Sequence, residues 1–324
     1  MYTSIVVPLD GSDFGMRALP VALTLARRSD ASVHLVHVRE PIVVPEDGPR
    51  FYDDRELGLR ADVTALATRL SREAAVQVES EFLEGPAAST IGQYVDADGH
   101  DLLVMMTHGR GGLSRWWLGS VADGLIRQTS VPLLLLRQES AWLEDAAEPL
   151  FRRVLVPLDG SSVADGVLDH VMSLATPDVT VYVLLTVVIP ARAMEYPFTE
   201  TGVLAGPQDD AHQHETALTY LEGVADELRM GEGLVEVLVV THANAAQAIL
   251  DTAREQHADL IALSTHGRGG VSRLMHGSVA DKIVRGAAVP VLVYRPTRSD
   301  TEPSMHPPAR ATDVTVSTTS FVAA

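Results

Sequence analysis

The chain of 324 residues contains no cysteine, which excludes disulfide bonds, thiol catalysis and cysteine-ligated metal sites. Aromatic residues make up only 5%, so we expect a core of Val, Leu, Ile and Ala. Lysine occurs once, as Lys282, and nearly all cationic side chains are therefore arginines. No apolar run reaches the ~18 residues of a membrane span, and no basic, apolar leader opens the sequence. We therefore expect a soluble, cytoplasmic protein with no membrane partner.

Positive charge is also scarce. The formal net charge is −18 at pH 7, and such a surface repels the phosphates of a nucleic acid. We therefore expect no nucleic-acid partner. Hydrophobic content of 46% and charged content of 21% are typical of a globular protein, and the length suggests two domains.

One stretch occurs twice. Residues 107–115 read THGRGGLSR and residues 265–273 read THGRGGVSR, and each is followed by GSVAD, at 119–123 and 277–281. The openings match too, as PLDGS at 8–12 and at 157–161. The offset is 149 at the opening (159 − 10) and 158 at the loop (267 − 109), so the second copy carries nine extra residues in between (158 − 149). The chain is therefore a tandem repeat.

Apolar runs alternate with helical patterns in both repeats. In repeat one we expect strands near 5–8, 33–38, 76–82, 102–107 and 131–136, and helices near 13–28, 56–72, 86–98 and from 120. In repeat two we expect strands near 154–157, 179–188, 235–241, 260–265 and 289–294, and helices near 163–174, 212–229, 245–257 and 278–285. Pro20 predicts a kink or an irregular turn. The loop 190–210 should contain the main insertion.

This alternation predicts an α/β fold of two tandem, doubly wound, five-stranded parallel-sheet domains of Rossmann-like type. We place domain 1 at 1–137, a linker at 138–151, domain 2 at 152–296 and a disordered tail, rich in Pro, Ser and Thr, at 297–324. Ligands of such sheets bind at the carboxyl ends of strands near the switch point. The Asp-Gly-Ser turn and the Gly-rich loop should therefore face one crevice.

The Gly-rich loop has the composition of an anion site. The Gly-Ser pairs predict helix starts with Ser120 and Ser278 as N-caps. Free backbone N–H groups, the helix dipole and the adjacent Arg110 or Arg268 favour phosphate there. The alternatives are a purely structural turn, and arginines that pair with the acidic surface.

Two other residue types near the loop allow two interpretations each. Asp10 and Asp159 are candidate ligands, but Asp-Gly-Ser is also a common turn sequence. His108 and His266 invite a catalytic assignment, yet no carboxylate stands at a spacing that identifies an orienting partner. A structural hydrogen bond at the strand end explains these histidines better, and we assign no catalytic residue and no metal ligand.

Together these residues resemble the universal stress protein (UspA) family in its tandem two-domain form. The ATP-binding branch of that family has the motif Gly-x2-Gly-x9-Gly-(Ser/Thr). Its later part is intact twice, from Gly109 and from Gly267, whereas the first glycine is replaced by Met106 in repeat one and by Ser264 in repeat two. The resemblance covers residues 2–137 and 152–296 and implies an adenine nucleotide alpha hydrolase-like fold.

The resemblance implies that ATP or a related adenine nucleotide binds in one or both repeats, with Mg²⁺ bridging the phosphates. It places the ribose or adenine near the opening aspartate, the base beside Val38 and Thr186, and the phosphates on the Gly-rich loop. The bulk of Met106 makes repeat two the better candidate. The implied nucleotide-binding residues are Pro8, Asp10, Gly11, Ser12, Val38, His108, Gly109, Arg110, Gly119, Ser120, Val121, Pro157, Asp159, Gly160, Ser161, Thr186, Ser264, His266, Gly267, Arg268, Gly277, Ser278 and Val279.

Family members also pair through the fifth strand, which makes 133–136 and 291–294 candidate edges for pairing one repeat on the other or for a homodimer. Three functions follow as hypotheses. The first is a stress-response regulator that binds an adenine nucleotide. The second is a slow ATP hydrolase, although the chain has neither a P-loop nor a first-turn dinucleotide motif. The third is a scaffold that binds no nucleotide.

Overall fold

The computed structural model describes residues 1–40, 54–107, 118–137, 148–190, 207–230, 233–265 and 278–296. Repeat one comprises β1 (Ser4–Pro8), α1 (Asp13–Met16), α2 (Leu19–Ser29), β2 (Ser32–Arg39), α3 (Asp54–Ala74), β3 (Val78–Glu84), α4 (Ala87–Ala97), β4 (Leu102–Thr107), α5 (Ser120–Gln128) and β5 (Leu133–Arg137). Repeat two comprises β6 (Arg153–Pro157), α6 (Ser162–Asp165), α7 (Leu168–Leu174), β7 (Val181–Val188), α8 (Pro207–Met230), β8 (Leu234–Thr241), α9 (Ala245–Glu255), β9 (Leu260–Ser264), α10 (Ser278–Gly286) and β10 (Val291–Tyr294).

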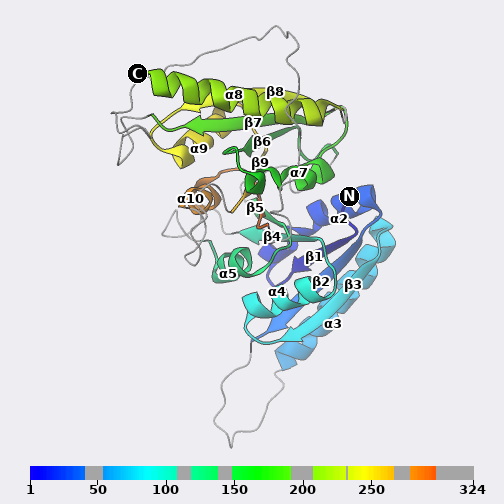
Figure 1. Cartoon of the computed structure of the whole chain (residues 1–324). Coiled ribbons are helices and arrows are strands. Elements are labelled where there is room, and N and C mark those ends of the chain that lie inside the picture. Colours follow the sequence, from blue (N-terminus) through cyan, green and yellow to red (C-terminus); the bar gives the residue numbers. More distant parts are fainter. Residues whose placement is uncertain are drawn as a thin grey trace, which may run out of the picture.

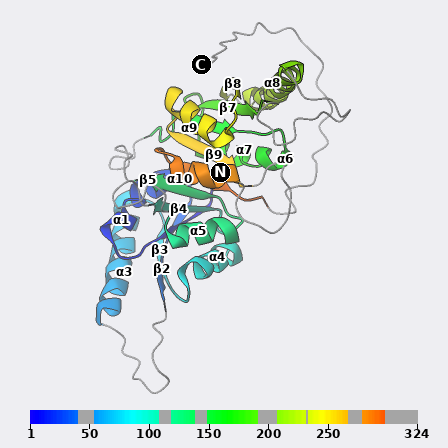
Figure 2. The same ribbon diagram turned by 90° about the vertical axis from the view of Figure 1, so that its left-hand side faces the viewer.

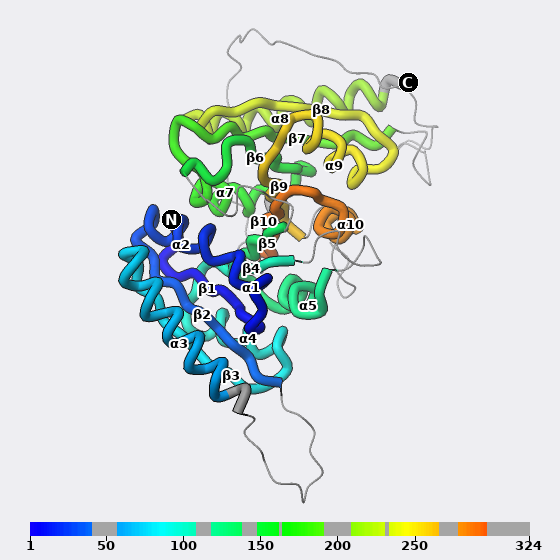
Figure 3. The backbone as a smooth tube through the Cα atoms, turned by 180° about the vertical axis from the view of Figure 1, so that it is seen from behind, coloured from blue at the N-terminus to red at the C-terminus, as the bar shows by residue number. Residues whose placement is uncertain are grey.

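The strands form one ten-stranded sheet in the order β3-β2-β1-β4-β5-β10-β9-β6-β7-β8 (Figure 1). Neighbouring strands run parallel within each repeat, as between β1 and β4 or β6 and β9. The repeats meet where β5 and β10 pair antiparallel, with Leu134 opposite Leu292 (Figure 3). The predicted fold class of two tandem five-stranded parallel units is confirmed. The two segments predicted as pairing edges lie next to each other at the centre of the sheet.

Helices cover both faces of the sheet. Helices α2, α3, α7 and α8 pack on one face, and α4, α5, α9 and α10 pack on the other. Figure 2 shows α3 on one side of the strands of repeat one and α4 with α5 on the other. The buried side chains are mostly Val, Leu, Ile and Ala, as the low aromatic content predicts. No helix within the described ranges is long and apolar enough to cross a membrane.

The helix expected over 13–28 is instead two helices, α1 and α2, and the break lies before Pro20. Pro20 falls in the first turn of α2, where its missing N–H group costs no intrahelical hydrogen bond. Repeat two has the same break between α6 and α7, with Asp169 at the equivalent position (20 + 149). The predicted irregular turn near Pro20 is therefore confirmed, but the proline is not required for it, because the break is a common feature of both repeats.

Other boundaries shift by a few residues. Helix α8 begins at Pro207, so the predicted loop 190–210 is shorter at its carboxyl end. Strands β5 and β10 begin after Pro132 and Pro290, which have no N–H group to donate. Their carbonyls still accept hydrogen bonds from Leu103 N at 3.0 Å and Ile261 N at 3.1 Å. The predicted linker ends inside the core, since Leu150 and Phe151 are buried.

Side chains also join the repeats on the face of α2 and α7. Arg28 of α2 donates to Ser173 O at 2.6 Å and to Leu174 O at 3.0 Å, which satisfies carbonyl groups at the end of α7. The Tyr2 hydroxyl donates to His170 O at 3.3 Å. Repeat two therefore anchors both the first strand and the first long helix of repeat one.

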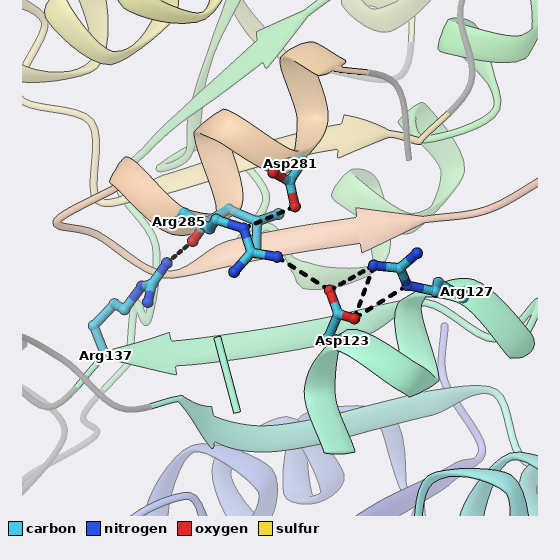
Figure 4. A network of polar contacts seen from close by, with 6 residues as sticks. Asp123, Arg127, Arg137, Asp281 and Arg285 are labelled. Carbon is cyan, nitrogen blue, oxygen red and sulfur yellow. Dashed lines mark hydrogen bonds and ion pairs between the residues drawn. The ribbon is translucent and has the colours of Figure 1, made fainter. Parts of the chain in front are cut away.

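A second set of polar contacts joins the repeats on the opposite face (Figure 4). Arg137, at the end of β5, donates to Val284 O of α10. Its counterpart Arg295 (137 + 158) donates to Arg127 O of α5. Each contact therefore connects the end of the fifth strand of one repeat to the last helix of the other repeat.

Candidate functional site

The Asp-Gly-Ser turn has the same geometry in both repeats. In repeat one, Asp10 Oδ1 accepts from Ser12 N at 2.9 Å and from Ser12 Oγ at 2.5 Å. In repeat two, Asp159 Oδ1 accepts from Ser161 N at 3.1 Å and from Ser161 Oγ at 2.5 Å. The aspartates are therefore turn formers, as one of the two interpretations predicted. The turn also fixes where each carboxylate lies.

Two further features of the turn explain its sequence. Gly11 and Gly160 have φ of +79° and +80°, a conformation that favours glycine. Ser12 is the N-cap of α1 and accepts from Gly15 N at 3.2 Å, and Ser161 caps α6 by accepting from Ala164 N at 3.2 Å. Each turn thus stops a strand and starts a helix at the carboxyl edge of the sheet.

Val38 and Thr186, the residues predicted to lie beside the base, are at the ends of the second strands but do not occupy equivalent positions. Pro8 lies opposite Val36 and Pro157 opposite Leu185, so the counterpart of Thr186 is His37 and not Val38. Thr186 Oγ1 donates to Leu158 O at 2.9 Å, and His37 Nδ1 lies 2.8 Å from Leu9 O.

The offset of 149 residues between the repeats already pairs these two positions (186 − 149 = 37), so the sequence contains the signal that identifies His37. His37 is buried, with 7% of its surface exposed. An imidazole therefore supports this strand end in repeat one, and a hydroxyl supports it in repeat two. Val38 packs partly buried beneath α4 and α5.

The carboxyl end of the fourth strand differs between repeats. Met106 is 7% exposed and packs in the core on the α1 and α2 face. Its counterpart Ser264 has only a hydroxymethyl side chain, and its Oγ lies 3.5 Å from Ala164 O of α6. Since β4 is the parallel neighbour of β1, and β9 of β6, these residues lie beside the Asp-Gly-Ser turns. The strand end beside the turn therefore has a larger side chain in repeat one.

The helix after the loop begins differently from the prediction. Gly119, not Ser120, is the N-cap of α5, and no side chain caps the helix. The helix begins after Gly119, so Ser120 is the first residue of α5 and not its N-cap. The Ser120 side chain is exposed. Ser278 and Val279 likewise open α10 and are exposed, whereas Val121 is partly buried. The prediction of Ser120 as N-cap was wrong. An uncapped first turn presents N–H groups that can bind an anion.

The loops themselves lie outside the described residues. This concerns His108, Gly109, Arg110, His266, Gly267, Arg268 and Gly277. The structure thus places the turns, the strand ends and the helix starts that surround each loop, and the predicted loop contacts stay predictions. Among the described residues, no group of three or more His, Asp or Glu side chains is arranged to hold a metal ion.

A carboxylate that sequence reasoning missed lies next to the turn of repeat two. Asp165 of α6 accepts a hydrogen bond from the Tyr220 hydroxyl of α8. Burial raises the pKa of the Asp165 carboxyl above its ordinary value, and Asp159 raises it further, while the Tyr220 hydrogen bond lowers it. The counterpart in repeat one is Met16 (165 − 149), so aligning the repeats would have revealed the difference.

The described residues beside the turn differ between the repeats in size and in charge. Repeat two has the small Ser264 at the end of its fourth strand and exposed residues at the start of α10, whereas Met106 at the equivalent strand end of repeat one is buried. Asp165 is a second carboxyl group beside the turn of repeat two, and burial together with Asp159 favours its neutral form. Carboxyl groups at the turn disfavour an anion there, whereas the N–H groups of a helix start favour one.

Sheet order and the paired Asp-Gly-Ser turns define a tandem, doubly wound α/β protein of Rossmann-like type. The family model described as the universal stress protein family matches residues 1–137 and again residues 150–295. The chain therefore belongs to the universal stress protein family.

Individual relatives agree. A universal stress protein of Mycobacterium tuberculosis is 25% identical over 309 residues, which cover 90% of this chain and 96% of that protein. One from Methanocaldococcus jannaschii is 34% identical over 143 residues, covering 43% of this chain and 84% of that protein. The crystal structure of a universal stress protein from Archaeoglobus fulgidus has a TM-score of 0.68 at 19% identity, over 90% of this chain and 98% of that chain. That structural likeness bears on the fold alone.

Proposed function

We propose that this protein is a stress-response regulator that binds ATP or a related adenine nucleotide, with Mg²⁺ bridging the phosphates, in the crevice of repeat two. One observation carries the proposal: the carboxyl ends of the parallel neighbours β6 and β9 bring the Asp159 turn beside a small residue, Ser264, and α10, the helix that follows the loop, starts with exposed residues. A helix start has N–H groups without intrahelical partners and therefore favours phosphate, and the ordered turn supplies polar groups for the nucleoside. ATP is available in the cytoplasm, and we propose that the protein is located there.

Repeat one has a different role in this proposal. Met106 occupies its crevice and packs into the core, which favours the scaffold hypothesis for this half of the chain. Repeat one then pairs with repeat two through β5 and β10 and does not bind nucleotide well. We propose domains 1–137 and 152–296, joined at this sheet junction.

We also infer that pairing of the repeats in one chain replaces pairing between chains at the fifth strands. The hydrogen-bonding edges of β5 and β10 cover each other, so a homodimer has to form through another surface. Sedimentation velocity gives the mass in solution. A monomer agrees with this inference, and a dimer that dissociates when Leu134 is replaced by Pro contradicts it.

The mechanism of regulation is a shift between conformations. A ligand shifts an equilibrium only when it binds the two states unequally. Nucleotide bound at the start of α10 favours the conformation in which this helix start can contact the phosphates. Arg285 of α10 connects this helix to Asp123 of α5. Binding in repeat two is therefore expected to alter the surface that both repeats share.

Calorimetry with ATP and Mg²⁺ tests the proposal on the whole protein and on two variants. Gly277→Glu places bulk and negative charge at the predicted phosphate position of repeat two, and Gly119→Glu is the matched control in repeat one. We expect the first variant to abolish binding and the second to retain most of it. No heat from the folded wild-type protein at millimolar ATP would establish the scaffold alternative, and released phosphate in the same samples measures slow hydrolysis.

A further inference from the structure

Two histidines of repeat one lie in contact at the amino-terminal edge of the sheet. His34 of β2 and His100, just before β4, have ring centroids 4.6 Å apart in an edge-to-face arrangement. The Tyr94 ring of α4 lies 4.6 Å from the His100 ring. This edge is opposite to the carboxyl edge that carries the crevice, so the proposed nucleotide site does not use these side chains. We call His34 and His100 the histidine pair.

His100 is the buried member of the pair, with 6% of its surface exposed. Its Nδ1 lies 2.7 Å from Ser4 Oγ, and its Nε2 is buried without a hydrogen-bond partner. A neutral imidazole that donates from Nδ1 to Ser4 leaves only a lone pair on Nε2. Protonation adds a hydrogen to Nε2, which then becomes a buried, charged donor without an acceptor. Such a donor is costly.

His34 has several polar neighbours. Its Nε2 lies 3.1 Å from Ser32 Oγ, and its Nδ1 lies 3.4 Å from the Tyr94 hydroxyl and 3.8 Å from Glu79 Oε2. Burial raises the pKa of Tyr94 to about 12, so this phenol stays neutral wherever histidines titrate. The acidic side chains on β3 that affect Tyr94 are Glu79 and Glu81.

Opposing charges act on His100. Burial lowers the pKa of His100 below its ordinary value, and the neighbouring His34 lowers it further. Asp98 and Asp101 raise it, but the net direction is downward. Asp101 is also held by other groups, since it accepts from Thr3 N at 2.7 Å and from Ser4 N at 3.0 Å. The fold therefore favours the neutral form of His100.

Repeat two has the same backbone arrangement at this edge. Asp259, the counterpart of Asp101, accepts from Arg152 N at 2.8 Å and from Arg153 N at 3.1 Å. Both histidines are absent there, because Val183 stands at the position of His34 (34 + 149) and Ala258 at that of His100 (100 + 158). Repeat two is thus an internal control for the histidine pair.

A permanent charge occupies this edge of repeat two instead. Arg153 stands at the position of Ser4 and forms two hydrogen bonds with Glu236, of 3.0 Å and 2.8 Å. Glu236 lies opposite Val183, as Glu79 lies opposite His34. A guanidinium that stays charged therefore supports the edge in repeat two, whereas repeat one has the two imidazoles of the histidine pair there.

We propose that the histidine pair makes repeat one, but not repeat two, open at its amino-terminal edge as the pH falls below about 6.5. The sign follows from linkage: for a histidine with a depressed folded-state pKa, the unfolded chain binds more protons. Stability is therefore complete above the unfolded pKa and declines as the pH falls toward the folded pKa. The opening frees the amino-terminal ends of β1 and β2 and the end of α4, which the pair holds together.

Hydrogen exchange of the whole protein without nucleotide, measured at pH 7.5 and pH 5.5 and corrected for intrinsic rates, tests this proposal. Peptides over 2–5 and 94–103 report on repeat one, and peptides over 151–154 and 252–261 report on the same places in repeat two. We expect the opening constant of repeat one to rise by up to about tenfold per pH unit, the limit for one linked proton. The opening constant of repeat two should not change between the two pH values.

The matched variant is His34→Val with His100→Ala, which installs the residues of repeat two. It should remove the extra response of repeat one at pH 5.5. An equal response of both repeats in the wild-type protein, or an unchanged response in the variant, overturns the proposal. If the variant fails to fold, the titration of the His100 ring in the wild-type protein by NMR decides, because a midpoint at or above 6.5 contradicts the proposal and a lower one supports it.

Discussion

Arg285 of α10 places its Nη2 3.2 Å from Oδ1 of Asp123 in α5, so a side chain of each repeat meets at the helices that follow the two Gly-rich loops. Asp123 also accepts two hydrogen bonds from Arg127 Nη2, of 3.1 Å and 2.8 Å. Arg285 in turn donates to Asp281 at 2.9 Å (Figure 4). These four residues connect α5 with α10 directly, and each of the two helices starts at a predicted phosphate position.

Replacing Asp123 should weaken the junction more than replacing its counterpart Asp281. Asp123 contacts arginines from both repeats and its side chain is 27% exposed. Asp281 forms an ion pair with Arg285 of its own helix, and its side chain is 36% exposed. We expect Asp123→Ala to lower the free energy of unfolding by about 1–2 kcal/mol and Asp281→Ala by about 0.5 kcal/mol. Urea denaturation measures both, and equal losses would contradict the asymmetry.

The left-handed turn glycine Gly11 should resist substitution. An alanine there adopts a φ of +79°, and its Cβ lies 2.9 Å from Leu59 Cδ1. We expect Gly11→Ala to lower the free energy of unfolding by about 1–2 kcal/mol. Gly58 is the control, because it lies within α3 and a Cβ added there would meet no atom within 4 Å. Gly58→Ala should raise stability by about 0.5–1 kcal/mol, and a loss of similar size at both glycines would rule out backbone strain as the cause.

The Arg153–Glu236 pair should contribute to stability only when Glu236 is charged. The hydrogen bond from Arg153 lowers the pKa of Glu236, against the effect of burial. A depressed carboxyl pKa adds stability above the unfolded value, about 4.3, and this stability is lost as the pH falls through the folded value. The Glu236 side chain is 47% exposed, so we expect Glu236→Gln to cost about 0.2–1 kcal/mol at pH 7.

The same substitution should have little effect at pH 3, where part of the pair is lost in the wild-type protein as well. Denaturation of the wild type and of Glu236→Gln at both pH values measures the difference. In an Arg153→Gln background, the pH-dependent part of the stability lost on replacing Glu236 by Gln should vanish. A constant cost across the pH range, or one that persists in that background, would mean that Glu236 stabilises β8 without its charge.

Much of the fold follows from the sequence because local patterns determine it. The duplicated PLDGS and THGRGG segments fix the repeat, and the apolar runs locate the strands to within a few residues. The break between α1 and α2 was not predicted as a feature of both repeats, because Pro20 is a strong local signal and yet is compatible with the first turn of a helix. A comparison with Asp169 in repeat two would have shown that no proline is needed.

The candidate site was less predictable. The role of Asp10 and Asp159 as turn formers follows from a local motif, and the structure places both as that motif requires. Asp165 and Tyr220 come together from helices although they are 55 residues apart in sequence, and no local pattern marks such a pair. The contact of His37 with Leu9 was not predicted for another reason. His37 lies inside an apolar strand, and only the register of β1 and β2 shows which residue it faces.

The side chain at position 106 should decide whether repeat one binds nucleotide. Met106→Ser installs the residue of repeat two, and we expect it to add nucleotide binding in repeat one. Because Met106 is 7% exposed and packs in the core, the change should also cost about 2–4 kcal/mol of stability. Calorimetry in the Gly277→Glu background isolates repeat one. If the folded double variant shows no binding, the bulk of Met106 is not the obstacle.

The central claim is that the folded chain holds an adenine nucleotide in repeat two. Equilibrium dialysis against radiolabelled ATP with Mg²⁺ counts the nucleotides per chain most directly. We expect one bound nucleotide per chain. A folded protein that retains none at millimolar ATP would contradict the claim, and so would one nucleotide per chain that Gly119→Glu removes and Gly277→Glu leaves in place.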